Sequence, residues 1–231
     1  MYIVTGVSRG LGKAIVEELL KKNEKVIGLG RSHGFSHPNF LFMECDLAHP
    51  ESIEKLDFPE FNEKIVLINN AGIIGEIKRL SDQITNDLQT VLNINVTSPI
   101  YLMKKAYAKV KDKSAFSLIN ISSGAANRAI PSWAGYCASK AALNMLTETF
   151  YLEELEKGNK PIVYAVSPGV IDTDMQVQIR SSNQNDFSSV DNFKELKSNN
   201  SLFSSQEAAQ KLLFLLDKPF EGEVFQDLRK L

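Results

Sequence analysis

Tyr136 and Lys140 lie four residues apart and are the pair in this sequence whose side-chain types best suit acid–base chemistry. This spacing places both side chains on one face of a helix. A free phenol has a pKa near ~10, and a nearby ammonium lowers that pKa because it favours the phenolate. The pair is therefore expected to act as a general acid near neutral pH. Without other motifs, a solvent-exposed surface pair would be the better interpretation.

Two other positions could complete a site for proton and hydride transfer. Ser123 ends a predicted strand thirteen residues before Tyr136. Its hydroxyl can donate a second hydrogen bond to a carbonyl oxygen that becomes anionic as hydride arrives. Pro99 lies inside a predicted helix and has no N–H, so the main-chain carbonyl of Asn95 loses its intrahelical partner. The proline is expected to expose this acceptor; an ordinary kink is the alternative.

A glycine-rich turn follows the first predicted strand, with the sequence Thr5-Gly6-Val7-Ser8-Arg9-Gly10-Leu11-Gly12. Such a turn lets the backbone approach a pyrophosphate, which then lies against the amino terminus of the next helix. Three glycines alone could be only a tight connection. Their position between a first strand and a helix favours a dinucleotide site.

The end of the second predicted strand indicates which dinucleotide binds. An acidic residue there would accept a hydrogen bond from a ribose hydroxyl and select NAD. This chain has Gly30-Arg31-Ser32 instead, and Arg31 together with Arg9 could pair with a 2′-phosphate. We therefore predict NADPH/NADP+ as the cofactor; two solvated surface arginines are the alternative.

The elements that must position these residues alternate along the chain. Short apolar runs predict strands at 2–5, 25–29, 39–43, 65–68, 116–121, 162–166 and, last, 223–225. Helical periodicity predicts helices at 11–22, 51–56, 81–110, 132–156 and 205–216. This alternation predicts an α/β protein in which residues 1–231 form a single NADP-binding domain, a doubly wound (Rossmann) fold with a seven-stranded, mainly parallel sheet.

One segment, residues 175–205, is rich in Ser, Asn, Gln and Asp. Long polar insertions in compact α/β domains are often functional. We therefore predict a substrate-gating segment, with Met175, Val177, Ile179 and Phe187 turned toward the substrate. A plain surface excursion is the alternative.

Composition excludes several classes of function. The formal charge is −2 without long blocks of like charge, so neither nucleic acid nor an anionic membrane is expected as a partner. Two cysteines and no long apolar stretch favour a cytoplasmic protein. The histidines His33, His37 and His49 are scattered among polar residues, so no metal site is expected.

Taken in chain order, the motifs resemble one family. The glycine turn is followed by Asn69-Asn70-Ala71-Gly72, Asn95, Ser123, Tyr136 with Lys140, and Pro168-Gly169. This order resembles the short-chain dehydrogenase/reductase family over nearly the whole chain. The stretches 119–126, 133–137 and 168–176 are most similar to its sepiapterin reductase and bacterial benzil reductase branch.

The resemblance implies roles for individual residues. It implies catalytic roles for Asn95, Ser123, Tyr136 and Lys140, with the lysine also holding the nicotinamide ribose and the Asn95 carbonyl holding a water of the proton relay. It also implies a homo-oligomer, a dimer. The cofactor-binding residues expected from the turn, the arginines and the resemblance are Gly6, Ser8, Arg9, Gly10, Leu11, Gly12, Arg31, Asp46, Leu47, Asn70, Ala71, Gly72, Tyr136, Lys140, Pro168, Gly169, Ile171 and Thr173.

The expected reaction is the reduction of a ketone or diketone to a secondary alcohol. Ala125, Trp133 and Met175 are expected to line an apolar substrate pocket that suits an aromatic or vicinal dicarbonyl compound. Sepiapterin reductases anchor the pterin with an aspartate near the carboxyl terminus, and the matching position here is Gln226, which argues against a pterin substrate. The same fold could also serve a catalytically idle NADP(H)-sensing regulator or an enzyme that oxidises alcohols with NAD.

Overall fold

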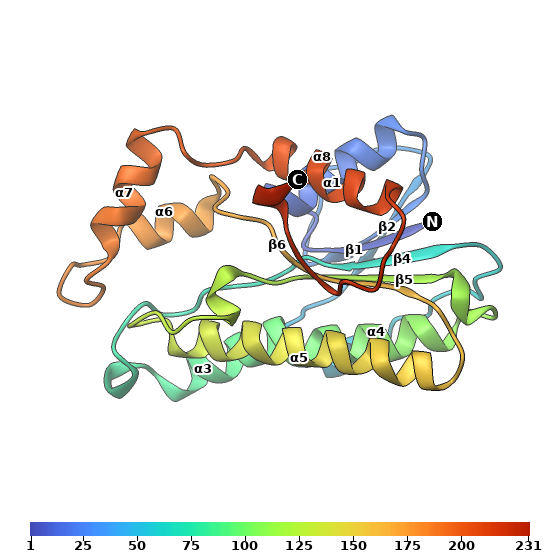
Figure 1. Ribbon diagram of the computed structural model, residues 1–231, viewed down its shortest axis with the longest axis horizontal. Coiled ribbons are helices and arrows are strands. Elements are labelled where there is room, and N and C mark those ends of the chain that lie inside the picture. Colours follow the sequence, from blue (N-terminus) through green and yellow to red (C-terminus); the bar gives the residue numbers. More distant parts are fainter.

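A parallel sheet forms the centre of the molecule, which the computed structural model describes over residues 1–231. The strand order is β3-β2-β1-β4-β5-β6-β7, and every neighbouring pair is parallel. The prediction of seven strands in a doubly wound α/β fold is confirmed (Figure 1). The strands are β1 (Tyr2–Thr5), β2 (Val26–Gly30), β3 (Phe40–Glu44), β4 (Ile65–Asn69), β5 (Phe116–Ile121), β6 (Ile162–Ser167) and β7 (Phe225–Asp227).

Helices cover both faces of this sheet. In Figure 1, α1 (Gly10–Lys21) and α8 (Ser205–Asp217) lie above it, and α3, α4 and α5 lie below it. Because both faces are covered, every residue of β4 and β5 is buried, which explains why most of their residues are apolar. The remaining helices are α2 (Glu51–Glu54), α3 (Thr85–Leu92), α4 (Ser98–Ala108), α5 (Ala134–Glu156), α6 (Asp174–Arg180) and α7 (Val190–Ser198).

The strand order reverses between β1 and β4. The chain adds β2 and β3 on one side of β1, and then β4 to β7 on the other side. In sheets of this kind ligands bind at the carboxyl ends of the strands, at the point of reversal. The glycine turn after β1 and the Asn-Asn-Ala-Gly turn after β4 both lie at that point.

The single helix predicted for 81–110 is wrong. The structure has a short 3-10 turn (Leu80–Asp82), then α3, a π-helical turn (Asn93–Thr97) and α4. Pro99 lies in the first turn of α4, and the Ser98 N–H bonds to the carbonyl of Asn93, five residues earlier. The missing proline N–H thus coincides with a wider helical turn, as happens at π-bulges.

Two other expectations concern the last strand and the polar segment 175–205. The last strand begins at Phe225 instead of 223, because its register pairs Ala165 of β6 with Phe225 and Ser167 with Asp227. Within 175–205 the chain forms most of α6 and all of α7, which project beyond the sheet at the left of Figure 1.

Two kinds of feature are absent from the fold. The helices are all too short or too polar to cross a membrane. His, Cys, Asp and Glu side chains nowhere gather in groups of three or more that could bind a metal ion.

Candidate active site

A cleft of about 1500 Å³ opens at the carboxyl end of the sheet. Its walls include the glycine turn and Arg31, the proposed tyrosine and lysine, and the aromatic residues Trp133 and Phe193. The structure brings every residue predicted for catalysis, cofactor binding or the substrate pocket to this cleft except Gly12 and Asn95, which lie behind its wall.

The glycine turn is built to leave room for a dinucleotide. Gly6 and Gly10 adopt positive φ angles of 72° and 55°, a conformation that glycine adopts without strain. The side chain of Asn70 donates a hydrogen bond to the Thr5 carbonyl, 2.9 Å away, so the turn after β4 is tied to the turn after β1. The open cradle and the amino terminus of α1 at Gly10 fit a pyrophosphate.

Gly12 has a packing role and does not line the cleft, contrary to expectation. A Cβ atom there would lie 2.2 Å from the carbonyl oxygen of Gly6 and 2.4 Å from Nδ2 of Asn70. Real Cβ atoms do not approach so closely, and glycine alone lets α1 begin directly behind the turn.

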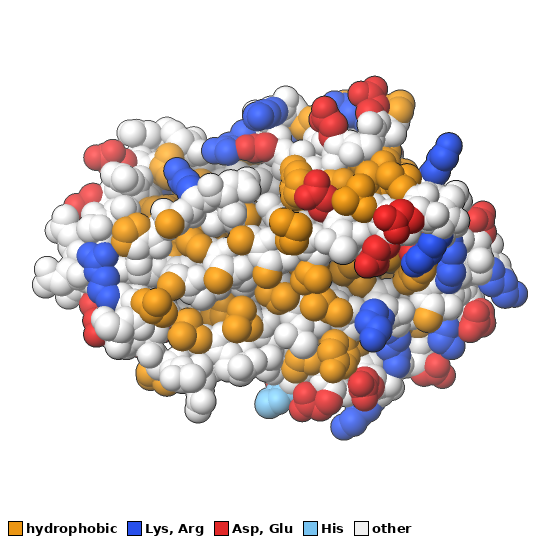
Figure 2. Space-filling view, turned by 60° about the horizontal axis from the view of Figure 1, so that its bottom comes forward, with side chains coloured by type: hydrophobic (Ala, Val, Ile, Leu, Met, Phe, Trp, Pro, Cys, Tyr) orange, Lys and Arg blue, Asp and Glu red, His pale blue; other side chains and the backbone are white.

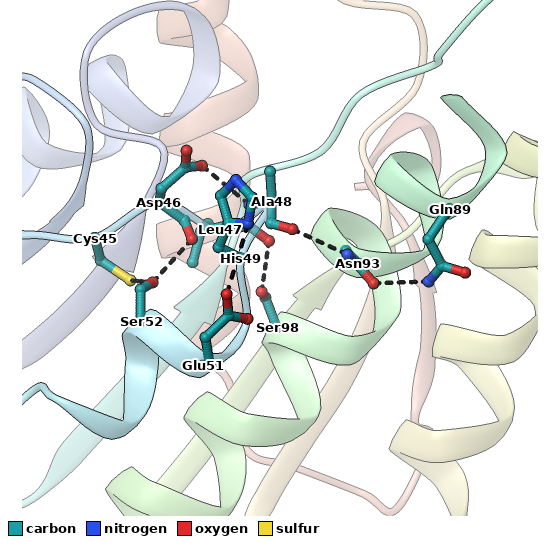
Figure 3. A network of polar contacts seen from close by, with 10 residues as sticks. All are labelled: Cys45, Asp46, Leu47, Ala48, His49, Glu51, Ser52, Gln89, Asn93 and Ser98. Carbon is teal, nitrogen blue, oxygen red and sulfur yellow. Dashed lines mark hydrogen bonds and ion pairs between the residues drawn. The ribbon is translucent and has the colours of Figure 1, made fainter. Parts of the chain in front are cut away.

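Hydrogen bonds from the π-helical turn and its neighbour fix the predicted adenine-contacting loop, as Figure 3 shows. The buried Ser98 hydroxyl donates to the Leu47 carbonyl at 2.7 Å, and Asn93 Nδ2 donates to the Ala48 carbonyl at 2.9 Å. Asp46 is held too, because its carboxylate accepts the Ala48 N–H at 3.0 Å. Sequence reasoning missed Asn93 and Ser98 as positioning residues, although the neighbouring Pro99 indicated an irregular helix there.

The two arginines predicted to read a 2′-phosphate differ in their surroundings. Arg31 is exposed on the cleft wall and forms no side-chain hydrogen bond or ion pair. Arg9 lies in the glycine turn, and its Nη1 atom is 2.9 Å from Oδ2 of Asp174, at the start of α6. Both partners of that ion pair are mostly exposed, with side-chain accessibilities of 75% and 68%, so the pair is weak.

Tyr136 and Lys140 lie together on α5, one helical turn apart. The Lys140 ammonium is 5.7 Å from the centre of the Tyr136 ring, and it donates to the Ile121 carbonyl at 2.8 Å. The Tyr136 hydroxyl forms a hydrogen bond with Ser123. Both α5 side chains are less than one-tenth exposed, so the pair is not the surface pair that the spacing alone would favour.

Burial shifts the pKa values of both Tyr136 and Lys140. Burial raises the pKa of Tyr136 above its usual value, and the hydrogen bond to Ser123 opposes the rise only in part. The net pKa is therefore raised, and not lowered as the spacing to the ammonium predicted. Burial also lowers the pKa of Lys140 to about 8. At neutral pH the phenol thus keeps the proton that a general acid must give.

Lys140→Met tests the cost of this buried charge. The pKa of Lys140 is about 8 in the folded protein and 10.5 for a free side chain, so between these pH values the unfolded chain binds more protons. The free energy of unfolding of the parent is therefore expected to rise with pH across this window, whereas the variant lacks the rise. At pH 7 the variant is expected to be more stable than the parent.

Chemical denaturation over a pH series measures this difference. Lys111→Met, at an exposed lysine, is the matched control and should follow the parent. Parallel pH curves for the parent and Lys140→Met would contradict the assigned cost of burial.

Asn95 is buried and turns its side chain away from the cleft. Its amide oxygen accepts the Ile73 N–H, and its amide nitrogen donates to the Ile73 carbonyl, each at 2.9 Å. The same nitrogen donates to the Ser139 hydroxyl at 3.0 Å. The side chain therefore ties the turn after β4 to α5, one residue before Lys140.

The predicted substrate residues Ala125, Trp133 and Met175 all line the cleft. Trp133 meets Tyr136 edge to face, with ring centres 5.8 Å apart. The sequence did not indicate several further lining residues, because no pattern marks them: Ile74, Ile130, Gln176 and Phe193.

Of the four residues of 175–205 that are expected to face the substrate, two line the cleft. Met175 and Ile179 line the cleft. Val177 is 56% exposed on the outer side of α6. Phe187 is fully buried behind Trp133, on which it stacks with ring centres 5.3 Å apart. The apolar residues of the segment therefore form a small core of their own against the cleft wall.

The fold and the site define a dinucleotide-dependent oxidoreductase. The chain matches the family described as short chain dehydrogenase over residues 1–184, and it belongs to that family. It is an oxidoreductase that acts on the C=O/CH–OH group with a nicotinamide cofactor.

The chain is also similar to individual proteins of this class. A benzil reductase ((S)-benzoin forming) from Bacillus subtilis (strain 168) is 36% identical over 242 residues, covering 100% of this chain and 98% of the relative. An NADPH-dependent pterin aldehyde reductase from Arabidopsis thaliana is 29% identical over 185 residues, 75% of each chain. The crystal structure of a short chain dehydrogenase/reductase from Saccharomyces cerevisiae superposes with a TM-score of 0.81 at 28% identity, covering 98% of this chain and 95% of that one.

Proposed function

We propose that this protein is an NADPH-dependent carbonyl reductase that reduces an aromatic or vicinal diketone, of the benzil kind, to a secondary alcohol. The observation that carries the proposal is the buried Tyr136 hydroxyl, hydrogen-bonded to Ser123 beside Lys140, on the wall of a cleft that Ala125, Trp133 and Met175 also line. The likeness to benzil reductases over the full chain supports the same substrate class.

The side chains of the site have distinct tasks in this reaction. The substrate carbonyl oxygen accepts hydrogen bonds from the Ser123 and Tyr136 hydroxyls, which stabilise the negative charge that develops on it. A bound NADPH supplies the hydride. Tyr136 gives its proton to the same oxygen, and the Lys140 ammonium steadies the phenolate left behind. Asn95 keeps the helix that carries both residues in register with the turn after β4.

NADPH is favoured over NADH because of charge at the far end of the cleft. The strand end that would need an acidic residue for NAD carries Arg31, whose guanidinium has no partner in the protein. Arg9 can add a second guanidinium by exchanging Asp174 for the 2′-phosphate.

Pterin reduction is the second candidate, and the region near β7 argues against it. Gln226 lines the cleft where a pterin-anchoring acid would stand, and its amide donates to the Glu223 carbonyl at 2.9 Å. The neighbouring Asp227 is neutralised by Arg229, which donates to it from Nε at 2.9 Å. Neither Gln226 nor Asp227 therefore offers a free carboxylate to a pterin.

A substrate panel tests the proposed function. NADPH oxidation is followed with benzil, 1-phenyl-1,2-propanedione, sepiapterin and a pterin aldehyde, each at the same concentration. The diketones are expected to be reduced with the higher kcat/KM. Faster reduction of the pterins would select the second candidate, and tight NADPH binding without reduction of any compound would indicate a regulator.

The segment 175–205 is proposed to gate the substrate site. Polar links that can break hold its first helix: the exposed Arg9–Asp174 ion pair and a hydrogen bond from Gln178 to the Gly75 carbonyl. Amide hydrogen exchange is expected to slow across residues 175–189 when NADPH binds, and again when an inert substrate analogue binds, because closure shelters the backbone. Strong protection in all three states would mean a fixed wall.

A homodimer is proposed through α4 and α5. Figure 2 shows the face that these helices form, with apolar side chains spread across it. Met145 and Leu152 lie two helical turns apart on α5 and are 64% and 53% exposed, and Tyr101 of α4 is 37% exposed. Leu152→Glu is expected to convert a dimer to a monomer in light scattering, because it buries a charge at the interface. Leu41→Glu, at an equally exposed position on β3, is the control.

A further inference from the structure

Five buried side-chain polar atoms lack a hydrogen-bond partner, and two of them belong to residues of the cleft wall. The five atoms are Asn69 Oδ1, Gln83 Oε1, Trp133 Nε1, Gln176 Oε1 and Arg180 Nη1. Only Trp133 and Gln176 line the cleft. Because buried polar groups are nearly always hydrogen-bonded, an unpaired group on a cleft wall indicates a contact that a ligand completes.

The Trp133 indole lies next to the proposed proton donor. Its ring meets the Tyr136 ring at 89°, with centres 5.8 Å apart. Phe187 and Phe193 of the gating segment pack on it, with ring centres 5.3 Å from the indole in both cases. These rings cover the N–H in the free protein, so a substrate oxygen reaches this donor when the gating segment that carries Phe187 and Phe193 shifts.

Gln176 brings a second unpaired group to the same wall. It follows Met175 on α6 and is 6% exposed, with its amide oxygen unpaired. A primary amide offers both an acceptor and two donors, and rotation of the amide exchanges them. Two unpaired polar groups on residues of one cleft suit a substrate with a second oxygen close to the reacting carbonyl.

We propose that the Trp133 indole N–H donates a hydrogen bond to the second oxygen of the substrate, on the carbon next to the carbonyl that is reduced. Gln176 assists by binding the same end of the substrate. The inference deepens the proposed function and rests on it: it makes Trp133 the residue that selects vicinal dicarbonyl compounds over monoketones of the same shape. A monoketone leaves the indole N–H unpaired, and that loss lowers its kcat/KM.

Benzil and deoxybenzoin form the matched substrate pair, because deoxybenzoin has the same two phenyl rings but a CH₂ group in place of one carbonyl. Trp133→Phe removes the N–H and keeps an aromatic ring against Phe187. We expect this variant to lose about tenfold in kcat/KM for benzil and less than twofold for deoxybenzoin. Comparing both substrates in both proteins cancels the greater intrinsic reactivity of the diketone.

Two controls separate the N–H from the shape of the side chain. Trp133 replaced by 3-benzothienylalanine keeps the bicyclic shape with sulfur in place of N–H, and it should show the same selective loss as Trp133→Phe. Phe193→Leu alters the packing and keeps the N–H, and it should change both substrates equally. Gln176→Met should also penalise benzil more than deoxybenzoin.

The outcomes distinguish this inference from the proposed function. If the parent reduces neither compound, the proposed function fails. If the parent reduces benzil and the shape-matched variant loses equally on both substrates, the function stands and the role of the indole N–H is overturned.

Discussion

Tyr136→Phe is expected to lower kcat for carbonyl reduction by about 10³-fold or more, because it removes both the proton donor and one of the two hydrogen bonds to the developing alkoxide. In this structure the substitution removes the hydroxyl without disturbing the packing of the ring. Phenylalanine keeps the ring that packs edge to face against Trp133, and only the hydroxyl bonded to Ser123 is lost. NADPH affinity, measured by calorimetry or nucleotide fluorescence, should stay within a few-fold of the parent value.

A matched control exists for the loss of a buried tyrosine hydroxyl. Tyr164 of β6 is 2% exposed and lies outside the cleft. Tyr164→Phe should leave turnover within about twofold, because its hydroxyl reaches neither substrate nor cofactor. If Tyr136→Phe kept a tenth of the parent rate, its assignment as proton donor would be wrong.

Arg31→Asp is expected to invert the coenzyme preference, changing the ratio of kcat/KM with NADPH to that with NADH by about 10²-fold. A carboxylate at this position repels the 2′-phosphate and can accept a hydrogen bond from the free ribose hydroxyl of NADH. The side chain is exposed and unpaired, so the substitution breaks no contact within the protein.

The ratio is measured from initial rates with each coenzyme at saturating diketone. Arg79→Asp makes the same charge change at an exposed position outside the cleft, and it separates local phosphate recognition from the loss of overall positive charge. An unchanged ratio in Arg31→Asp would remove the basis for assigning NADPH. Arg9→Ala should lower NADPH affinity further and free Asp174.

The parts of the site that could be predicted from sequence are those set by local chain geometry. The positions of Tyr136 and Lys140 follow from helical spacing, and Gly6 and Gly10 follow from a turn that needs positive φ angles. The strands could be predicted for the same reason, since a strand buried on both faces is a continuous apolar run. The short chain dehydrogenase fold was therefore accessible from the printed residues.

Other features depend on residues that are distant in the sequence. Arg9 and Asp174 are 165 residues apart, and nothing near either one indicates their ion pair. The π-helical turn is held by Asn93, which bonds to a loop 45 residues away, and so a periodicity analysis extended one helix through it. The predicted start of β7 differs from the observed one because the register with β6, and not the sequence pattern of β7 itself, decides where the strand pairs.

By itself, the sequence determined which residues could take part in hydride and proton transfer and the order of the elements that carry them, because side-chain type and helical or strand period are local properties. Only the tertiary structure decided how those residues behave. Burial from several elements raises the pKa of Tyr136, against the expectation from its spacing to Lys140, and lowers the pKa of Lys140. Packing of Phe187 and Phe193 likewise leaves the Trp133 N–H unpaired, because desolvation depends on every neighbour that excludes water.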